Sequence, residues 1–176
     1  MFPTCDAAQK RIGKLCQRGV LRIVGFITEP AFRPGRPVNV YCTPTWRPHR
    51  RCLAHERLAT RLQLLYPQGR WERGYDFGHP YPDAKVLLGG VWYFVEADND
   101  TEGQKKWRRR VDAYAKLDDT VLVVTTSDDR VEQLLSWSDG FETACFTTID
   151  RVRADPWGKV WKTIERQEVS LVKPVG

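Results

Sequence analysis

Apolar side chains recur at helical spacing in four stretches of the chain, and these stretches predict four amphipathic helices. The helical stretches are 6–18, 53–66, 102–117 and 128–137. Runs rich in β-branched and aromatic residues lie outside them and predict strands. The strand-like runs are 20–27, 38–43, 70–77, 82–88, 91–98, 120–126 and 144–149. From residue 70 onward, three strands precede the order helix, strand, helix, strand, which predicts an α/β fold with an antiparallel start and a later crossover.

The first predicted helix is basic on one face, and Gly19 follows it as a candidate left-handed cap. Its apolar stripe contains Ala8, Ile12, Leu15 and Cys16. The other face carries Lys10, Arg11, Lys14 and Arg18. Two strands follow, joined by a turn-rich segment that contains Arg33 and Arg36. A basic helix followed by a hairpin is typical of a winged helix, in which the helix enters the major groove of DNA and the hairpin tip reaches phosphates or the minor groove.

The winged helix would be partial, because only five residues precede the helix. A partner could complete it, or the helix and hairpin could be packed for stability alone. A connector rich in Pro and Arg, residues 43–51, leads into the second helix. We therefore predict a DNA-binding module at 1–50 and an α/β domain at 51–176.

The distribution of charged residues also separates a basic first part of the chain from a more acidic second part. Residues 1–80 hold 14 Lys and Arg against 5 Asp and Glu, whereas residues 81–176 hold 14 against 17. A basic front end joined to a region that collects carboxylates is what a polyanion-binding module ahead of an acidic site would show. A soluble basic surface without function would give a similar charge distribution. The charges alone therefore do not distinguish it from a DNA-binding module.

Composition narrows the class of protein. With 41% hydrophobic residues and seven Trp, intrinsic disorder is not expected, and no apolar run reaches the roughly 20 residues of a membrane span. We predict no membrane partner. The first residues lack the apolar stretch of a secretory signal, so we expect a cytoplasmic protein with reduced thiols. The five cysteines are Cys5, Cys16, Cys42, Cys52 and Cys145.

The segment 82–98 is the most informative part of the sequence. If Gly89 and Gly90 form a two-residue hairpin turn, Asp83 lies directly opposite Glu96. Alternation along the strands then puts Lys85 and Asp98 on the same face as this pair. The other face is apolar and belongs in the core. It consists of Val86, Leu88, Val91, Tyr93 and Val95.

Opposed carboxylates repel one another, and a divalent cation would offset that repulsion. Oxygen donors on one face suit Mg²⁺ or Mn²⁺, so we predict a metal site made by Asp83 and Glu96 with help from Asp98. Such a metal neutralises a scissile phosphate and activates a water, and a nearby lysine can assist that water. The alternative is that these acids are solvated charges at the ends of strands.

At this point the sequence resembles the PD-(D/E)XK nuclease superfamily. The residues that match the motif of this superfamily are Pro82-Asp83 and, after a strand, Glu96-Ala97-Asp98. It is more closely similar to the replication-relaxation family of plasmid and phage proteins, through His55, the string 94–98, and the spacing of Arg110 and Tyr114. The resemblance implies a restriction-endonuclease-like mixed sheet flanked by helices behind a winged helix. It also implies metal binding by Asp83 and Glu96, with Glu56 as a supporting acid.

The sequence departs from the superfamily at its third signature residue, where the expected lysine is Asp98. The missing amine could come from Lys85 on the same hairpin face or from Lys105 on the next helix. Arg110 would be a poor base because a guanidinium stays protonated. If no amine reaches the site, the domain would be a nuclease scaffold that only binds DNA.

Two function hypotheses follow. The first is a DNA-binding protein with Mg²⁺-dependent endonuclease or nicking activity, plausibly a homodimer because cutting both strands needs two sites. The second is a catalytically inactive DNA-binding or regulatory protein on the same scaffold. A zinc site is a weaker alternative, since its spacing matches no strong motif. Its ligands would be Cys42, His49, Cys52 and His55.

Overall fold

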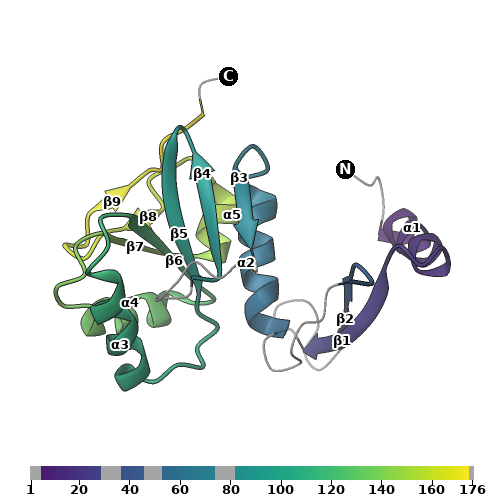
Figure 1. Ribbon diagram of the computed structural model, residues 1–176, viewed down its shortest axis with the longest axis horizontal. Coiled ribbons are helices and arrows are strands. Elements are labelled where there is room, and N and C mark those ends of the chain that lie inside the picture. The colour runs from purple at the N-terminus through teal and green to yellow at the C-terminus, as the bar shows by residue number, and fades with distance from the viewer. Residues whose placement is uncertain (1–4, 29–36, 46–52, 74–81, 175–176) are drawn as a thin grey trace. The chain divides into compact units, whose positions relative to one another are not determined.

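The computed structural model describes residues 5–28, 37–45, 53–73 and 82–174, and the chain forms two compact units, 1–54 and 55–176. Figure 1 labels the helices and strands of both units. Among the described residues, no helix has both the length and the apolar character needed to cross a membrane.

The first unit consists of one helix and one hairpin. Helix α1 (Cys5–Gln17) is followed by Gly19, whose φ of 70° lies in the left-handed region that glycine adopts without strain. Strands β1 (Arg22–Thr28) and β2 (Pro37–Cys42) pair antiparallel, with an irregularity between Ile23 and Gly25. The segment that joins these strands, including Arg33 and Arg36, lies outside the described residues.

The second unit contains a seven-stranded mixed sheet in the order β3-β4-β5-β6-β7-β8-β9. Its first five strands are β3 (Arg70–Arg73), β4 (Ala84–Leu88), β5 (Val91–Ala97), β6 (Thr120–Thr125) and β7 (Ala144–Thr148). The last two are β8 (Trp161–Lys162) and β9 (Glu168–Val169). The pairs β3–β4 and β4–β5 are antiparallel, while β5–β6 and β6–β7 are parallel, which confirms the predicted antiparallel start and crossover.

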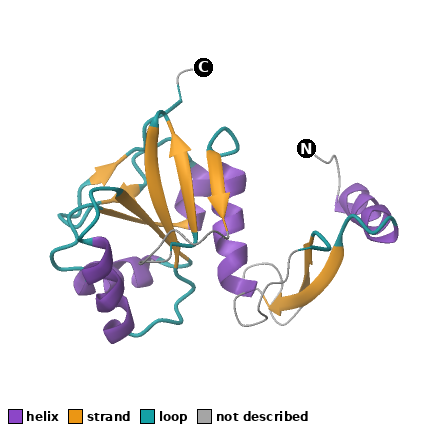
Figure 2. Ribbon diagram, viewed as in Figure 1, coloured by secondary structure: helices purple, strands orange, loops and turns teal. Residues whose placement is uncertain are grey.

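Helices cover both faces of this sheet (Figure 2). Helices α2 (Leu53–Leu65) and α5 (Ile149–Ala154) pack on one face, in a core that includes Leu62, Val95 and Val152. Helices α3 (Gln104–Tyr114) and α4 (Asp128–Trp137) pack on the other face, in a core around Phe146. The predicted α/β class, a mixed sheet flanked by helices, is therefore confirmed.

The β4–β5 hairpin has the predicted register, from Ala84 opposite Val95 to Leu88 opposite Val91. Gly89 and Gly90 form its turn with φ values of 55° and 82°, the left-handed conformations that a type I′ turn requires. The apolar face is buried as predicted except at Val91, which is 40% exposed beside the turn.

Three elements of the second unit were not predicted from the sequence: helix α5 and strands β8 and β9. The strand expected to run through residue 149 stops at Thr148, whose side chain accepts the Arg151 N–H and caps α5. Strands β8 and β9 are two residues long, so they carry too little alternation to be recognised in the sequence.

Candidate functional site

Glu96 lies near the end of β5 with only 3% of its side chain exposed. Helix α3 supplies both of its side-chain partners: Arg110 donates to Oε2, and the Tyr114 hydroxyl donates to Oε1. The spacing of four residues puts these two donors on one face of the helix. Arg110 also donates to Glu102 Oε1 at 3.0 Å. Glu96 is therefore held by protein donors on both oxygens.

Asp83 lies one residue before β4, where the regular ladder ends. Its N–H donates to the Val95 carbonyl at 3.0 Å, and its Oδ2 accepts the Ala97 N–H at 2.7 Å. The other oxygen, Oδ1, lies 2.5 Å from Nε2 of His55, in the first turn of α2. The carboxylate thus joins α2 to the β4–β5 hairpin beside Glu96.

The two carboxylates influence one another electrostatically. Burial raises the pKa of Glu96 well above its ordinary value, and the negative charge of Asp83 raises it further. The charge of Arg110 and the hydrogen bond from Tyr114 act in the opposite direction. The structure therefore brings Asp83 and Glu96 together, and their repulsion is offset by donors of the protein itself.

The neighbouring groups respond to the same charges. Burial alone would lower the pKa of His55, but the hydrogen bond and charge of Asp83 raise it above its ordinary value. Burial and the charge of Glu96 raise the pKa of Tyr114, so this hydroxyl stays protonated and acts as a donor. A phenol held in this way is not a nucleophile at neutral pH.

Asp98 has a different partner. Its carboxylate receives Nε of Arg130 at 2.8 Å and Nη2 at 2.9 Å, and both side chains are almost fully buried. Arg130 comes from α4, thirty-two residues further along the chain. The predicted assisting acid is thus held in a two-pronged ion pair, a partnership that the sequence did not predict. Glu56, the predicted supporting acid, is likewise paired, with Nη2 of Arg73 at 2.5 Å.

The two candidate lysines do not contact the carboxylate pair. Lys85 Nζ lies 4.8 Å from the centre of the Phe94 ring and 5.1 Å from that of Trp92. Lys105 is exposed in the first turn of α3. The cation that contacts Glu96 is Arg110, which the sequence marked only through the spacing of a basic residue and a tyrosine.

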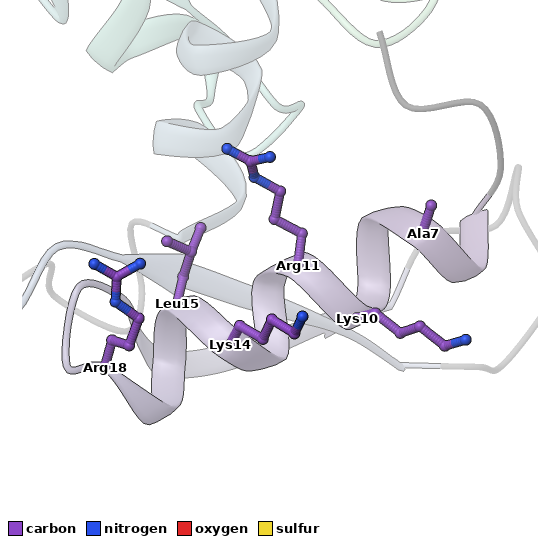
Figure 3. Close-up of a pocket in the computed structure, with 6 residues that line it drawn as sticks. All are labelled: Ala7, Lys10, Arg11, Lys14, Leu15 and Arg18. Atoms are coloured by element: carbon purple, nitrogen blue, oxygen red, sulfur yellow. The ribbon is translucent and has the colours of Figure 1, made fainter.

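The basic residues predicted to grip DNA lie along α1. Lys10, Arg11, Lys14 and Arg18 are exposed and, together with Ala7 and Leu15, line a shallow hollow of about 400 Å³ (Figure 3). None of these four cations forms an ion pair with a described residue. The predicted apolar stripe is half-buried. Among the described residues, the positive charge on this face of the helix is therefore not balanced by a carboxylate.

The carboxylates of Asp83 and Glu96 are the candidate ligands for a metal ion. Within the described ranges, no group of three or more His, Cys, Asp or Glu side chains is arranged to hold a metal ion. Two carboxylates with water ligands suffice for Mg²⁺, and Asp83 and Glu96 supply two. Each of their four oxygens already accepts a hydrogen bond from a protein donor. An ion bound there would compete with His55 and Arg110 for these oxygens.

Of the four predicted zinc ligands, the structure describes two, Cys42 and His55. Cys42 is buried, and its thiol donates to the Thr43 carbonyl at 3.0 Å. His55 is engaged by Asp83. The remaining candidates, His49 and Cys52, lie outside the described residues.

Comparisons with known proteins give little for this chain. No family model matches it, and no curated protein matches it. Among solved structures it is similar to the YaeQ protein from Xanthomonas axonopodis pv. citri, at 14% identity and a TM-score of 0.36. That match covers 74% of this chain and 73% of the other.

Proposed function

We propose that this protein binds double-stranded DNA through α1. The observation that carries the proposal is the exposed basic face of this helix, whose four cations have no ion-pair partner among the described residues. Released counterions make such a face attractive to a phosphate backbone. A groove-sized helix followed by a hairpin supports the same proposal, because this order is typical of winged helices.

The second unit refines the proposal. We propose that its mixed sheet is restriction-endonuclease-like and that the chain is related to the replication-relaxation proteins of plasmids and phages. Support comes from the positions of the motif residues: Asp83 and Glu96 lie together beside His55, and Arg110 and Tyr114 contact Glu96. The unit would then act in plasmid or phage DNA processing, as a scaffold for the DNA-binding module.

DNA binding is tested by fluorescence anisotropy with a labelled duplex at several salt concentrations. The triple variant Lys10→Ala/Lys14→Ala/Arg18→Ala removes three cations that are candidates for binding phosphates. We expect weaker binding and a salt slope smaller by about 0.9 for each phosphate that is no longer neutralised.

A matched control removes three exposed lysines of the second unit, Lys116, Lys159 and Lys173. This control changes the net charge equally and should keep the slope of the original protein. Equal slopes for the α1 variant and the original protein would overturn the proposal.

Metal-dependent cleavage is the second candidate function, favoured by the two carboxylates of Asp83 and Glu96 at the same end of the β4–β5 hairpin. Asp83 and Glu96 would hold Mg²⁺ or Mn²⁺, which supplies charge neutralisation of the phosphate and an activated water. Arg110 would orient Glu96, and His55 would orient Asp83, as they do in the structure. With Asp98 engaged by Arg130, no residue replaces the signature lysine beside this pair within the described ranges.

A plasmid-nicking assay with Mg²⁺ or Mn²⁺ separates the two candidates. Nicking that Asp83→Asn and Glu96→Gln each abolish, with duplex affinity unchanged, would establish the nuclease. An intact plasmid together with normal duplex binding would leave the inactive DNA-binding protein. A nuclease that cuts both strands is expected to be a homodimer on DNA, which sedimentation measures.

A further inference from the structure

Next to the Gly89–Gly90 turn, the face of β3–β4–β5 that carries Lys85 has no helix packed on it among the described residues, whereas α3 covers the same face further along β5, at Phe94 and Glu96. Helices α2 and α5 pack behind these strands, whereas α3 and α4 lie toward β6 and β7 (Figure 1). Arg70 pairs with Leu87 on β3–β4, and Leu87 pairs with Trp92 on β4–β5, so these three side chains lie together on the part of this face next to the turn. Trp92 is half-buried there and belongs to neither core.

Two cations lie on the Trp92 ring. Lys85 Nζ is 5.1 Å from the ring centre, and the guanidinium carbon of Arg70 is 5.9 Å from it. Both distances fall within the range of a cation–π contact. Glu72 on the same face lies 3.2 Å from Arg70 Nη2, while Asp83 and Glu96, at the other end of this face, are engaged by His55 and Arg110. Lys85 therefore leaves an excess of positive charge beside the indole.

A hollow adjoins this platform. It measures about 370 Å³ and includes Arg70 and Leu87, the direct neighbour of Trp92 across the ladder. Its remaining lining residues are Gln68, Gly89, Gly90 and Pro174. The hollow gives a group that stacks on the indole a place to extend, next to the Arg70 guanidinium.

We propose that this face binds single-stranded DNA by stacking an unpaired base on Trp92. Charge complementarity selects this occupant: an aromatic surface flanked by cations matches a base flanked by phosphates. A protein partner would need a larger apolar surface than Leu87 and Trp92 provide. The proposal goes beyond duplex binding by α1, because it assigns a second surface and a different form of DNA.

Binding of the DNA strand would replace a cation–π contact on Trp92 by a base stacked on its ring. A base that stacks on Trp92 displaces Lys85 or Arg70 from the ring, and the displaced cation then meets the backbone phosphate. Stacking on an aromatic ring is stronger than an exposed cation–π contact, so the exchange favours binding. The site tolerates any base, because every base presents a flat aromatic face.

The probe is a fluorescein-labelled dT12 oligonucleotide, titrated with the full chain and followed by anisotropy. Trp92→Ala should weaken binding about tenfold or more, within the range measured for one stacked base. Trp92→Phe keeps an aromatic face and should restore most of the affinity. Lys85→Ala should lower the salt slope by about 0.7, the value for one phosphate of a single strand.

Leu64→Ala is the matched control, since Leu64 is a large apolar side chain of α2 that is 72% exposed. Its dT12 affinity should equal that of the original protein. The ratio between original and Trp92→Ala affinities should persist when both carry the α1 triple substitution, and Trp92→Ala should not change duplex binding. Equal dT12 affinities of the original protein and Trp92→Ala, or no dT12 binding by the original protein, would overturn the proposal and leave duplex binding by α1 intact.

Discussion

At the scale of single residues, the acidic end of the β4–β5 hairpin is balanced by partners from three helices. His55 of α2 holds Asp83, Arg110 of α3 holds Glu96, and Arg130 of α4 holds Asp98. Breaking a buried ion pair leaves an uncompensated charge, which costs about 3–5 kcal/mol. These partners therefore fix the helices to the sheet at the place where the carboxylates gather.

His55 makes stability depend on pH. Its pKa in the folded protein lies above the ordinary 6.5, although burial and the charge of Arg110 oppose this shift. The stabilisation from the His55–Asp83 pair is therefore complete below pH 6.5 and is lost as pH rises through the folded-state pKa. We expect urea denaturation to show a decrease in stability above pH 6.5 that is smaller in His55→Gln.

Asp83→Asn provides the control for this pH dependence, because it removes the partner and keeps the side-chain shape. It should reduce the decrease in stability as His55→Gln does, and the double variant should add nothing further. A decrease of the same size in His55→Gln as in the original protein would contradict the assignment.

At the scale of elements, the hairpin turn fixes which face each carboxylate occupies. A slip of one residue in the pairing would turn every side chain of β4 to the opposite face. Gly89 and Gly90 prevent such a slip, because the turn needs positive φ at both positions. A Cβ at Gly89 would also lie 2.4 Å from Cγ1 of Val172, whereas one at Gly90 would meet open space.

Gly90 therefore isolates the conformational cost of the turn. Gly90→Ala should lower the free energy of unfolding by about 1–2 kcal/mol, since a Cβ is strained at φ 82°. Gly90→Asn should cost less, because asparagine tolerates the left-handed region better. Urea denaturation measures both changes, and equal stabilities of Ala and Gly at position 90 would show that the strain is absent.

Sequence patterns predicted the elements whose information is local. The Gly-Gly turn between two apolar runs predicted the register of Ala84 with Val95, and the helical spacing of apolar residues over 102–117 predicted α3. The side chains that pair with the carboxylates were harder to predict from the sequence. Asp98, directly after β5, meets Arg130 only in the folded unit, where α4 packs on β6 and β7, and nothing in either segment of the sequence marks that pairing.

At the scale of the whole second unit, Tyr66 and Trp161 connect the beginning of the sheet region to its end. The Tyr66 hydroxyl donates to the Pro156 carbonyl at 2.6 Å and accepts the Trp161 Nε1–H at 3.2 Å. Burial raises the pKa of Tyr66 to about 12, so the phenol remains a donor over the ordinary pH range. Trp157 packs edge-on against the same ring, with 5.0 Å between centroids.

Tyr66→Phe removes this connection while preserving the ring. It leaves the buried Trp161 N–H and the Pro156 carbonyl without their partner, so we expect a loss of about 1–3 kcal/mol in urea denaturation. Adding Trp161→Phe removes the unsatisfied indole N–H, and the double variant should lose less than the sum of the two single losses. Strict additivity would mean that the hydrogen bond contributes nothing.

The contact between Tyr66 and Trp161 also orders events during synthesis. Ninety-five residues separate the two side chains, and the ribosome makes Tyr66 first. While the nascent chain is still short of Trp161, the apolar side of α2 has no finished core to enter. Chaperones that recognise exposed apolar segments therefore have their longest opportunity at this helix, until the indole emerges from the exit tunnel.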